Sequence, residues 1–223
     1  MMQTIAHERL MAAVQAWDDW FRRGTIKTEQ MRAGGHMWLD GDKGLRGDLL
    51  GPVMHLHDGA AEVFYFLDGQ CRVELGDTAV IAKAGDFLFI PPQVPHNLFK
   101  EGPEDMRLLF AVAPNVFDNK WRTEGISTTG WEGAARPIPV SGPGELPGDH
   151  HLRSRALWID GTQEGRLDQA ERLYLVLSGQ VQYQDSLMTG TMKRGDFVHV
   201  TAGRPHTLAA EAALVLEMAP GIR

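Results

Sequence analysis

The stretch "HLHDGAAEVFYFLDG", residues 55–69, decides how the sequence is interpreted. His55 and His57 stand one residue apart, and Glu62 follows the second histidine by five positions. A β-strand directs alternate side chains to one face, so both imidazoles would project the same way, roughly 6 to 7 Å apart along the backbone. After the bend at residues 58–61, Glu62 opens a second strand and can return to the same place. Three potential metal ligands are thus supplied locally.

A fourth ligand is available in "GDFLFIPPQVPHNL", residues 85–98, where His96 follows a turn rich in proline. Imidazole and carboxylate groups together suit Fe, Mn, Ni, Cu or Zn, and the donor set does not choose among them. The absence of thiolates argues against a closed structural zinc site. Three histidines and one glutamate would leave one or two positions for water or substrate, which is a catalytic pattern. The predicted metal ligands are therefore His55, His57, Glu62 and His96.

Short runs of alternating polarity surround this stretch from residue 36 to about residue 113, with Asp68-Gly69 and Gly76-Asp77 as predicted turns. Many short strands at regular spacing indicate an antiparallel sandwich or barrel. The candidate strands are residues 37–39, 63–67, 71–75, 80–82, 87–90 and 108–112.

The pattern then recurs. "YFLDGQCRVEL" (65–75) is answered by "LVLSGQVQYQD" (175–185), and "AGDFLFIPPQVPHNL" (84–98) by "RGDFVHVTAGRPHTL" (194–208), both at an offset of 110 residues. "MWLD" (37–40) similarly precedes "LWID" (157–160). One shared offset indicates an internal duplication of a small β fold.

Four segments follow from this pattern. Leu10, Val14, Trp17 and Phe21 form one apolar stripe, which predicts a helix over residues 3–23 within an N-terminal helical segment, 1–34. Residues 35–113 are predicted to form a first barrel, with the metal site. Residues 114–150, rich in Gly and Pro, read as a linker, and residues 151–223 as a second barrel.

Composition restricts the partners. A net charge of -7 and a pI near 5.7 argue against nucleic acids and anionic membranes, which favour basic patches. Cys71 is the single cysteine, so no internal disulfide is expected, and its alternating surroundings predict a buried strand position. With no run of 18 apolar residues and no signal-peptide pattern, we expect a cytoplasmic protein.

These residues resemble the two sequence motifs of the cupin superfamily. His55, His57, Glu62 and Gly69 fit the first motif, and Gly85, Pro91 and His96 fit the second. The resemblance implies an all-β, double-stranded β-helix (jelly-roll) bicupin, with two tandem small barrels, in which the three histidines and the glutamate bind one metal. The departures are modest and bear on turns: Gly51 lies closer to His55 than the pattern asks, and Gln93 and Lys100 replace the second motif's inner glycine and final asparagine.

The second copy does not repeat the ligand set. Gly165, Leu167 and Arg172 stand at the positions of His55, His57 and Glu62, while His206 matches His96 and Gly203 restores the inner glycine. Glu171 lies one place off, and such a shift turns a side chain to the opposite face of a strand. We expect His206 to be a buried histidine hydrogen-bonded within its barrel. The second barrel is predicted to bind no metal and to serve stability, dimerisation or a small ligand.

The resemblance to quercetinase-like cupins favours a metal-dependent dioxygenase acting on a small aromatic or enolic substrate. Glu62 is then the candidate catalytic base. By alternation, Phe64 and Phe66 share its face, and Phe87 and Phe89 join them as candidates for an apolar substrate pocket. Ordinary barrel core is the competing role for all four phenylalanines.

Two other functions remain open at this stage. One is a non-catalytic cupin that binds a carboxylate or sugar. The other is a metal-dependent decarboxylase, isomerase or lyase, which would need charged groups near the metal; Asp58, Arg72 and Lys100 are the candidates by sequence distance. Cupin lyases of sulfoniopropionates carry a tyrosine where this chain has Phe64, which weakens that alternative. A small molecule is the expected partner, and a homodimer is possible because bicupins commonly pair edge strands.

Overall fold

The structure is a computed structural model that describes residues 26–38, 54–116, 119–121, 127–165 and 169–221. Within these ranges the elements of regular secondary structure are all β-strands. The described residues accordingly include no helix with the length and apolar character needed to cross a membrane. The predicted helix over residues 3–23 lies outside the described residues, as does Gly51.

The chain divides into two compact units. The N-terminal unit consists of Thr25–Val140 with Pro147–Leu152, and the C-terminal unit contains Ser141–Leu146 and Arg153–Arg223. Each unit has its own hydrophobic core.

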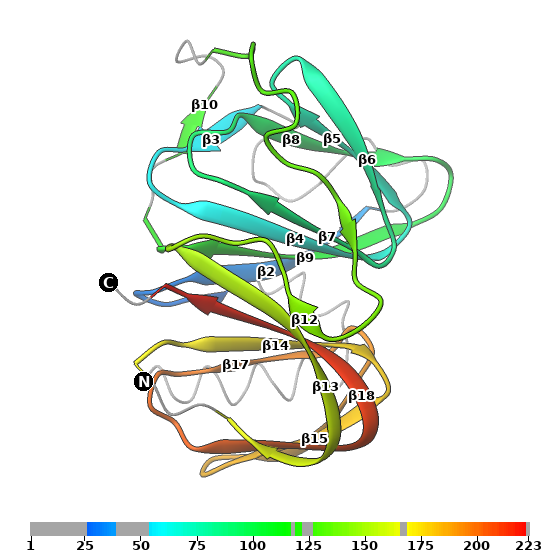
Figure 1. Cartoon of the computed structure of the whole chain (residues 1–223), viewed down its shortest axis with the longest axis vertical. Helices are drawn as coiled ribbons and strands as arrows, with labels where there is room; N and C mark the ends of the chain where they lie inside the picture. Colours follow the sequence, from blue (N-terminus) through cyan, green and yellow to red (C-terminus); the bar gives the residue numbers. More distant parts are fainter. Residues whose placement is uncertain (1–25, 39–53, 117–118, 122–126, 166–168, 222–223) are drawn as a thin grey trace. The chain divides into compact units, whose positions relative to one another are not determined.

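Two antiparallel sheets form the N-terminal unit and face one another (Figure 1). The first has the strand order β1 (Ile26–Lys27), β2 (Arg32–Trp38), β9 (Met106–Ala113), β4 (Ala61–Asp68), β7 (Asp86–Ile90) and β11 (Ile138–Pro139). The second has the order β10 (Asn119–Trp121), β3 (His55–His57), β8 (His96–Glu101), β5 (Gln70–Leu75) and β6 (Thr78–Lys83).

Alternation along β5 shows why these residues form strands around a core. Cys71, Val73 and Leu75 are fully buried, whereas Arg72 and Glu74 between them are partly exposed. The three buried side chains pack with Phe64, Phe66, Leu88, Ile90 and Val112 from the facing sheet. Cys71 is fully buried, which confirms its predicted place on the buried face, and burial raises the pKa of its thiol to about 12. Five of the six candidate strands lie within observed strands, and the described residues 37 and 38 of the sixth belong to β2.

The turn at Asp68-Gly69 carries the chain from one sheet to the other. β4 pairs with β7 and β9, whereas β5 pairs with β6 and β8. Gly69 has a φ of 70°, and a Cβ atom there would lie 2.4 Å from the backbone oxygen of Asp105. Only glycine combines that conformation with that close approach. The Gly76-Asp77 turn, by contrast, closes the β5–β6 hairpin.

Two predicted segment boundaries differ from the structure. The N-terminal segment predicted as helical to residue 34 is wrong over its described end, because β1 and the start of β2 occupy it, and consecutive glycines at 34 and 35 disfavour a helix. Residues 114–150, predicted as a linker, contribute the short strands β10, β11 and β12 (Gly144–Glu145), which pair with β3, β7 and β13.

The C-terminal unit is a sheet with the order β12, β13 (Leu152–Glu164), β18 (His206–Pro220), β14 (Arg172–Ser178) and β17 (Phe197–Val200). β15 (Gln180–Asp185) pairs with β18 and with β16 (Thr189–Lys193). Its pairing repeats that of the N-terminal unit. Arg172 lies opposite Val200, as Glu62 lies opposite Ile90, and β14 has a register shift between Val176 and Ser178, as β4 has between Phe66 and Asp68.

Candidate metal centre

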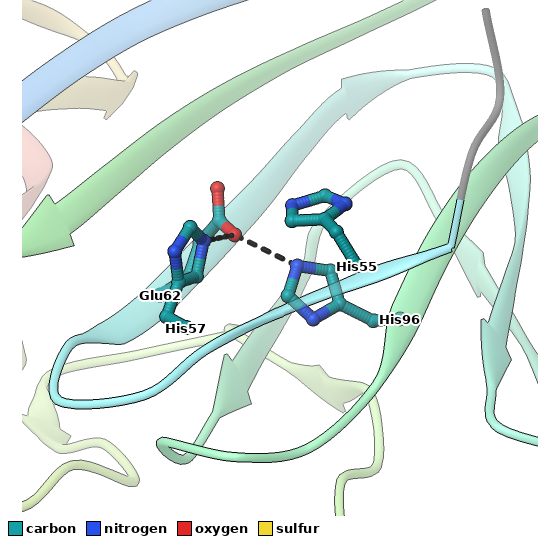
Figure 2. Close-up of side chains that lie close together, drawn as sticks. All are labelled: His55, His57, Glu62 and His96. Carbon is teal, nitrogen blue, oxygen red and sulfur yellow. Dashed lines mark hydrogen bonds and ion pairs between the residues drawn. The ribbon is translucent and has the colours of Figure 1, made fainter. Parts of the chain in front are cut away.

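The four predicted ligands come from three strands that converge in the N-terminal unit. His55 and His57 lie on β3, Glu62 begins the inward face of β4, and His96 opens β8 (Figure 2). His96 is paired with both His55 and Leu75 in register, and directly paired residues share a face of the sheet. Because Leu75 belongs to the core, this register directs both imidazoles into the interior.

The candidate ligand atoms of His55, His57, Glu62 and His96 all lie within 4.8 Å of one another. Oε2 of Glu62 is 3.1 Å from Nε2 of His57 and 2.9 Å from Nε2 of His96. The His55 ring lies 4.4 Å from the His96 ring, measured between centroids. His57, Glu62 and His96 are buried and His55 is half-buried, so the group has one side toward the exterior.

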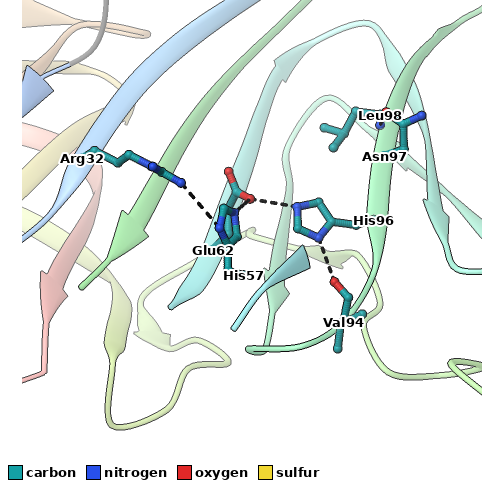
Figure 3. A network of polar contacts seen from close by, with 7 residues as sticks. All are labelled: Arg32, His57, Glu62, Val94, His96, Asn97 and Leu98. Carbon is teal, nitrogen blue, oxygen red and sulfur yellow. Dashed lines mark hydrogen bonds and ion pairs between the residues drawn. The ribbon is translucent and has the colours of Figure 1, made fainter. Parts of the chain in front are cut away.

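Hydrogen bonds outside the group orient the ligands. Nδ1 of His96 lies 2.9 Å from the backbone oxygen of Val94, to which it can only donate (Figure 3). In a neutral imidazole this leaves Nε2 as an acceptor facing an acceptor oxygen of Glu62. A proton on Nε2 or a metal ion between the two atoms resolves that conflict, and with a neutral imidazole the donor set fits a metal ion. The backbone NH of Gln93 also donates to the carbonyl of His57, at 2.7 Å, and fixes β3 against the β7–β8 turn.

The Glu62 carboxyl is held in its ionised form. Burial alone would raise its pKa, but hydrogen bonds and charge interactions with His57 and His96 hold the pKa well below its usual range. The carboxylate is therefore available as a ligand at neutral pH.

One further residue, which sequence reasoning missed, reaches the centre. Nη2 of Arg32 lies 3.5 Å from Nδ1 of His57, the ring nitrogen that faces away from Glu62 (Figure 3). Arg32 could not be placed at the centre from the sequence, because this strand was expected to start at residue 37, whereas β2 starts at Arg32. The register of β2 was needed to find it.

Of the four phenylalanines considered for an apolar pocket, two face the interior of the unit and two do not. Phe64 and Phe66 belong to the interior cluster, and the Phe64 ring lies 6.3 Å from the His96 ring. Phe87 and Phe89 are wrong: they pair with Tyr65 and Val63, on the face of the sheet opposite Glu62. Leu88 and Ile90 hold the interior positions instead, because a shift of one residue reverses the face.

The three charged residues considered for a decarboxylase or isomerase do not belong to the ligand group. Asp58 is exposed in the β3–β4 bend. Arg72 stacks over the Phe99 ring at 4.4 Å and pairs with Glu74. Nζ of Lys100 donates to the backbone oxygen of Gly102 at 2.7 Å.

In the C-terminal unit the matching positions have different chemistry. His206 keeps the bond from Nδ1 to a backbone oxygen, that of Arg204 at 2.9 Å, but its Nε2 lies 3.0 Å from the hydroxyl of Tyr174. This confirms the expectation of a buried, hydrogen-bonded histidine. Arg172, at the position of Glu62, donates to Glu217 at 3.0 Å. Glu171 contacts His199 at 3.1 Å rather than His206.

A second cluster of ligand types is present at the surface. Asp149, His150 and His151 have candidate ligand atoms within 4.8 Å of one another. They are consecutive residues in a turn, where Asp149 accepts hydrogen bonds from the backbone NH groups of His151 and Leu152. Their closeness follows from the turn itself.

Comparison with known proteins agrees with this geometry. Residues 47–112 match the family model Cupin_2, described as a cupin domain. Over 62 residues the chain is 29% identical to the uncharacterized protein MJ1618 of Methanocaldococcus jannaschii, a match that covers 28% of this chain and spans half the length of that relative. Residues 47–112 are thus similar to a cupin domain, and the fold of the chain is the jelly roll seen in solved cupin structures.

Solved structures with the same fold cover most of the chain. The protein Ylba from E. coli has a TM-score of 0.66 at 14% identity, covering 90% of this chain and 82% of that chain. A variant of salicylate 1,2-dioxygenase from Pseudoaminobacter salicylatoxidans in complex with gentisate has a TM-score of 0.64 at 12% identity, covering 86% and 69%. A variant of oxalate decarboxylase from B. subtilis has a TM-score of 0.55 at 13% identity, covering 87% and 70%. At these identities the likeness establishes the fold.

Proposed function

We propose that the chain is a metal-dependent cupin enzyme, a dioxygenase that acts on a small aromatic or enolic substrate bound at the centre of His55, His57, Glu62 and His96. The convergence of these four side chains, with their ligand atoms within 4.8 Å of one another, carries the proposal. When bound, a divalent transition metal supplies Lewis acidity and, where it is redox-active, the electron chemistry that oxygen requires.

The surrounding residues suit that reaction. Phe64 lies beside His96 and offers an apolar wall to an aromatic ring. Glu62 is the carboxylate of the group and the candidate acceptor for the proton of an enol or phenol. A dioxygenation that cleaves a carbon–carbon bond places both atoms of O2 in the product and takes all four electrons from the substrate, so no external reductant is required.

The named structural neighbours support this class and one rival. One acts on salicylate as a dioxygenase, and another is an oxalate decarboxylase. A decarboxylase would release CO2 without consuming O2, so the two reactions separate in one assay. A non-catalytic cupin would bind metal and ligand and do neither.

The first experiment measures metal content and oxygen consumption. We expect one transition metal ion per chain and O2 uptake, one mole per mole of substrate, with at least one member of a panel of salicylate, gentisate, flavonols, 1,3-diketones and catechols. His96→Ala and Glu62→Gln should weaken metal binding by more than about 10-fold, since even loss of a residue that merely supports a ligand costs that much. His206→Ala, the matched position of the C-terminal unit, should leave metal content unchanged.

Two results would contradict the proposal. Equal metal content in wild type, His96→Ala and Glu62→Gln would show that the ion binds elsewhere. Full metal loading without O2 uptake across the panel would reject the dioxygenase, and CO2 release from oxalate would then identify the decarboxylase.

A further inference from the structure

Arg32 lies on the same inner face as the metal centre. Strand pairing places Arg32 opposite Val112, and Val112 opposite Glu62, in one row across β2, β9 and β4. Directly paired residues of an antiparallel sheet project to the same side. Because Val112 is fully buried in the core, the row faces the interior of the unit.

The guanidinium ends beside a ligand of the centre. Nη2 of Arg32 is 3.5 Å from Nδ1 of His57, while Nε2 of the same ring is 3.1 Å from Glu62 (Figure 3). Arg32 is half-buried, so its charge is partly shielded from water. The centre therefore has a permanent cation directly outside its ring of ligands.

Metal binding would change the hydrogen bond between Arg32 and His57. A guanidinium only donates hydrogen bonds, so Nδ1 of His57 has to be the acceptor in the present arrangement. If Nε2 binds a metal, the proton of the neutral ring must reside on Nδ1. Nδ1–H of His57 and the guanidinium of Arg32 would then both be hydrogen-bond donors, with 3.5 Å between the two nitrogen atoms. An acceptor oxygen beside them could receive a hydrogen bond from each.

Charge favours an anionic acceptor. Glu62 is the single negative charge among the four ligands, so a divalent ion leaves the group with a net charge of +1. Arg32 adds its own positive potential at close range. A planar guanidinium fork matches a carboxylate in a bidentate manner, better than it matches a neutral oxygen.

We infer that Arg32 holds the carboxylate of the substrate, and that the site selects small carboxylic acids whose enolic or phenolic oxygen lies next to that carboxylate. Arg32 is then a specificity-determining residue. This inference rests on the proposed function of the metal centre and names its substrate class.

The test measures binding, separately from turnover. The full chain is loaded with Co2+, its metal content is determined, and salicylate or salicylamide is added under anaerobic conditions while calorimetry and the Co2+ absorption spectrum record binding. We expect salicylate to bind at least about 10-fold more tightly than salicylamide, since a charge-assisted pair is worth more than a neutral one. Arg32→Gln should weaken salicylate binding by about 10- to 100-fold and leave salicylamide nearly unchanged. Arg32→Lys should fall between the two.

Arg72→Gln is the matched control, because Arg72 is a partly exposed arginine of the same unit that points away from the core. It should bind salicylate as the wild type does, and thermal melts should show that both glutamine variants are folded. Equal binding of salicylate and salicylamide to the wild type, or equal loss of both in Arg32→Gln, would overturn the inference. Loss of Co2+ from Arg32→Gln would also overturn it, because Arg32 would then act by positioning His57.

The two proposals fail differently. Absence of Co2+ binding at the four ligands in the wild type rejects the metal centre on which both depend. Carboxylate binding that depends on Arg32, without any O2 consumption, retains the inference and rejects the dioxygenase.

Discussion

Gln93 has a φ of 69°, and among the residues that the structure describes it is the single non-glycine residue with a positive φ. It lies in the β7–β8 turn, and its backbone NH donates to the carbonyl of the ligand His57. Gly203, at the same place in the C-terminal unit, also has a φ of 69°. The left-handed conformation is costly for any residue with a Cβ atom, so the turn that fixes His57 contains local strain.

We predict that Gln93→Gly stabilises the protein by about 0.5 to 1 kcal/mol, because relief of strain exceeds the added freedom of glycine in the unfolded chain. The reciprocal change, Gly203→Gln, should destabilise by about 1 kcal/mol, since a Cβ there meets no atom within 4 Å and only the backbone conformation opposes it. Urea unfolding at neutral pH measures both. A loss of stability in Gln93→Gly would show that the Gln93 side chain itself contributes to the turn.

For single residues, the sequence predicted the place of a side chain correctly where spacing along the chain determines which face of a strand it occupies. His55, His57, Glu62 and His96 are brought together as expected, because period-2 geometry and the motif spacing leave little choice. Phe87 and Phe89 were misplaced because the pairing register of β7 with β4 is a tertiary property. Arg32 was missed for the same reason.

Among the elements, strands with an alternating or a continuously apolar run were predictable, and a strand without such a run was not. β5 alternates strictly and was found, whereas β8 was read only as the segment after a proline turn. The turn at Asp68-Gly69 was placed correctly, but its role as a crossing between two sheets depends on which strands pair. The turn between β15 and β16 is held by hydrogen bonds to the Asp185 side chain, which the sequence analysis did not predict. Asp185 accepts hydrogen bonds from the hydroxyl of Tyr183 at 2.7 Å and from the backbone NH groups of Leu187 and Met188 at 2.7 and 2.9 Å.

This turn should make stability depend on pH. Burial would raise the pKa of the Asp185 carboxyl, but the bonds from Tyr183, the turn backbone and Arg204 lower the pKa below its ordinary value of 3.8. A folded-state pKa below the unfolded value gives stability that is present above the unfolded pKa and lost as pH falls through the folded pKa. We predict that Asp185→Asn lowers the free energy of unfolding by about 1 to 3 kcal/mol at pH 7 and that the difference from wild type shrinks below pH 3.8.

Denaturant unfolding at several pH values checks this prediction. Asp77→Asn serves as the control, because Asp77 lies exposed in the corresponding β5–β6 turn. A difference between wild type and Asp185→Asn that stays constant down to pH 2 would exclude the ionised carboxylate as the cause.

Over the whole molecule, two units share pairing details that chance would rarely produce. Gly85 and Gly195 have φ values of 92° and 90°, and their backbone NH groups donate to Phe66 and Val176. The carboxylates of Asp86 and Asp196 each accept a hydrogen bond at 2.9 Å from the backbone NH of the lysine three residues before. These equivalences, 110 positions apart, support the proposed internal duplication. The sequence offset could predict these equivalences, whereas Arg172 and Gly165 at the positions of Glu62 and His55 show that the two units differ in chemistry.

If only the N-terminal unit binds metal, metal should stabilise the two units unequally. A ligand that binds the folded state adds about 2.7 kcal/mol at a concentration 100 times its dissociation constant. We predict that adding Co2+ slows backbone hydrogen exchange in β3, β4 and β8 and leaves β15 and β16 unchanged, and that a chelator reverses the effect. Mass spectrometry of the exchanged peptides measures this. Equal protection of both units would contradict a metal centre confined to one of them.

The contact between Gly165 and His206 limits how a second centre could be built. A Cβ atom at residue 165 would lie 1.8 Å from Nε2 of His206, so the imidazole fills the volume that any side chain there would need. Gly165→His alone would therefore collide with the histidine it was meant to assist. The hydrogen bond between Nε2 of His206 and the hydroxyl of Tyr174, at 3.0 Å, helps to hold the ring in that place. A four-ligand site in the C-terminal unit would therefore need several substitutions, because Gly165 and Arg172 both stand at ligand positions and His206 fills the space that a side chain at residue 165 requires.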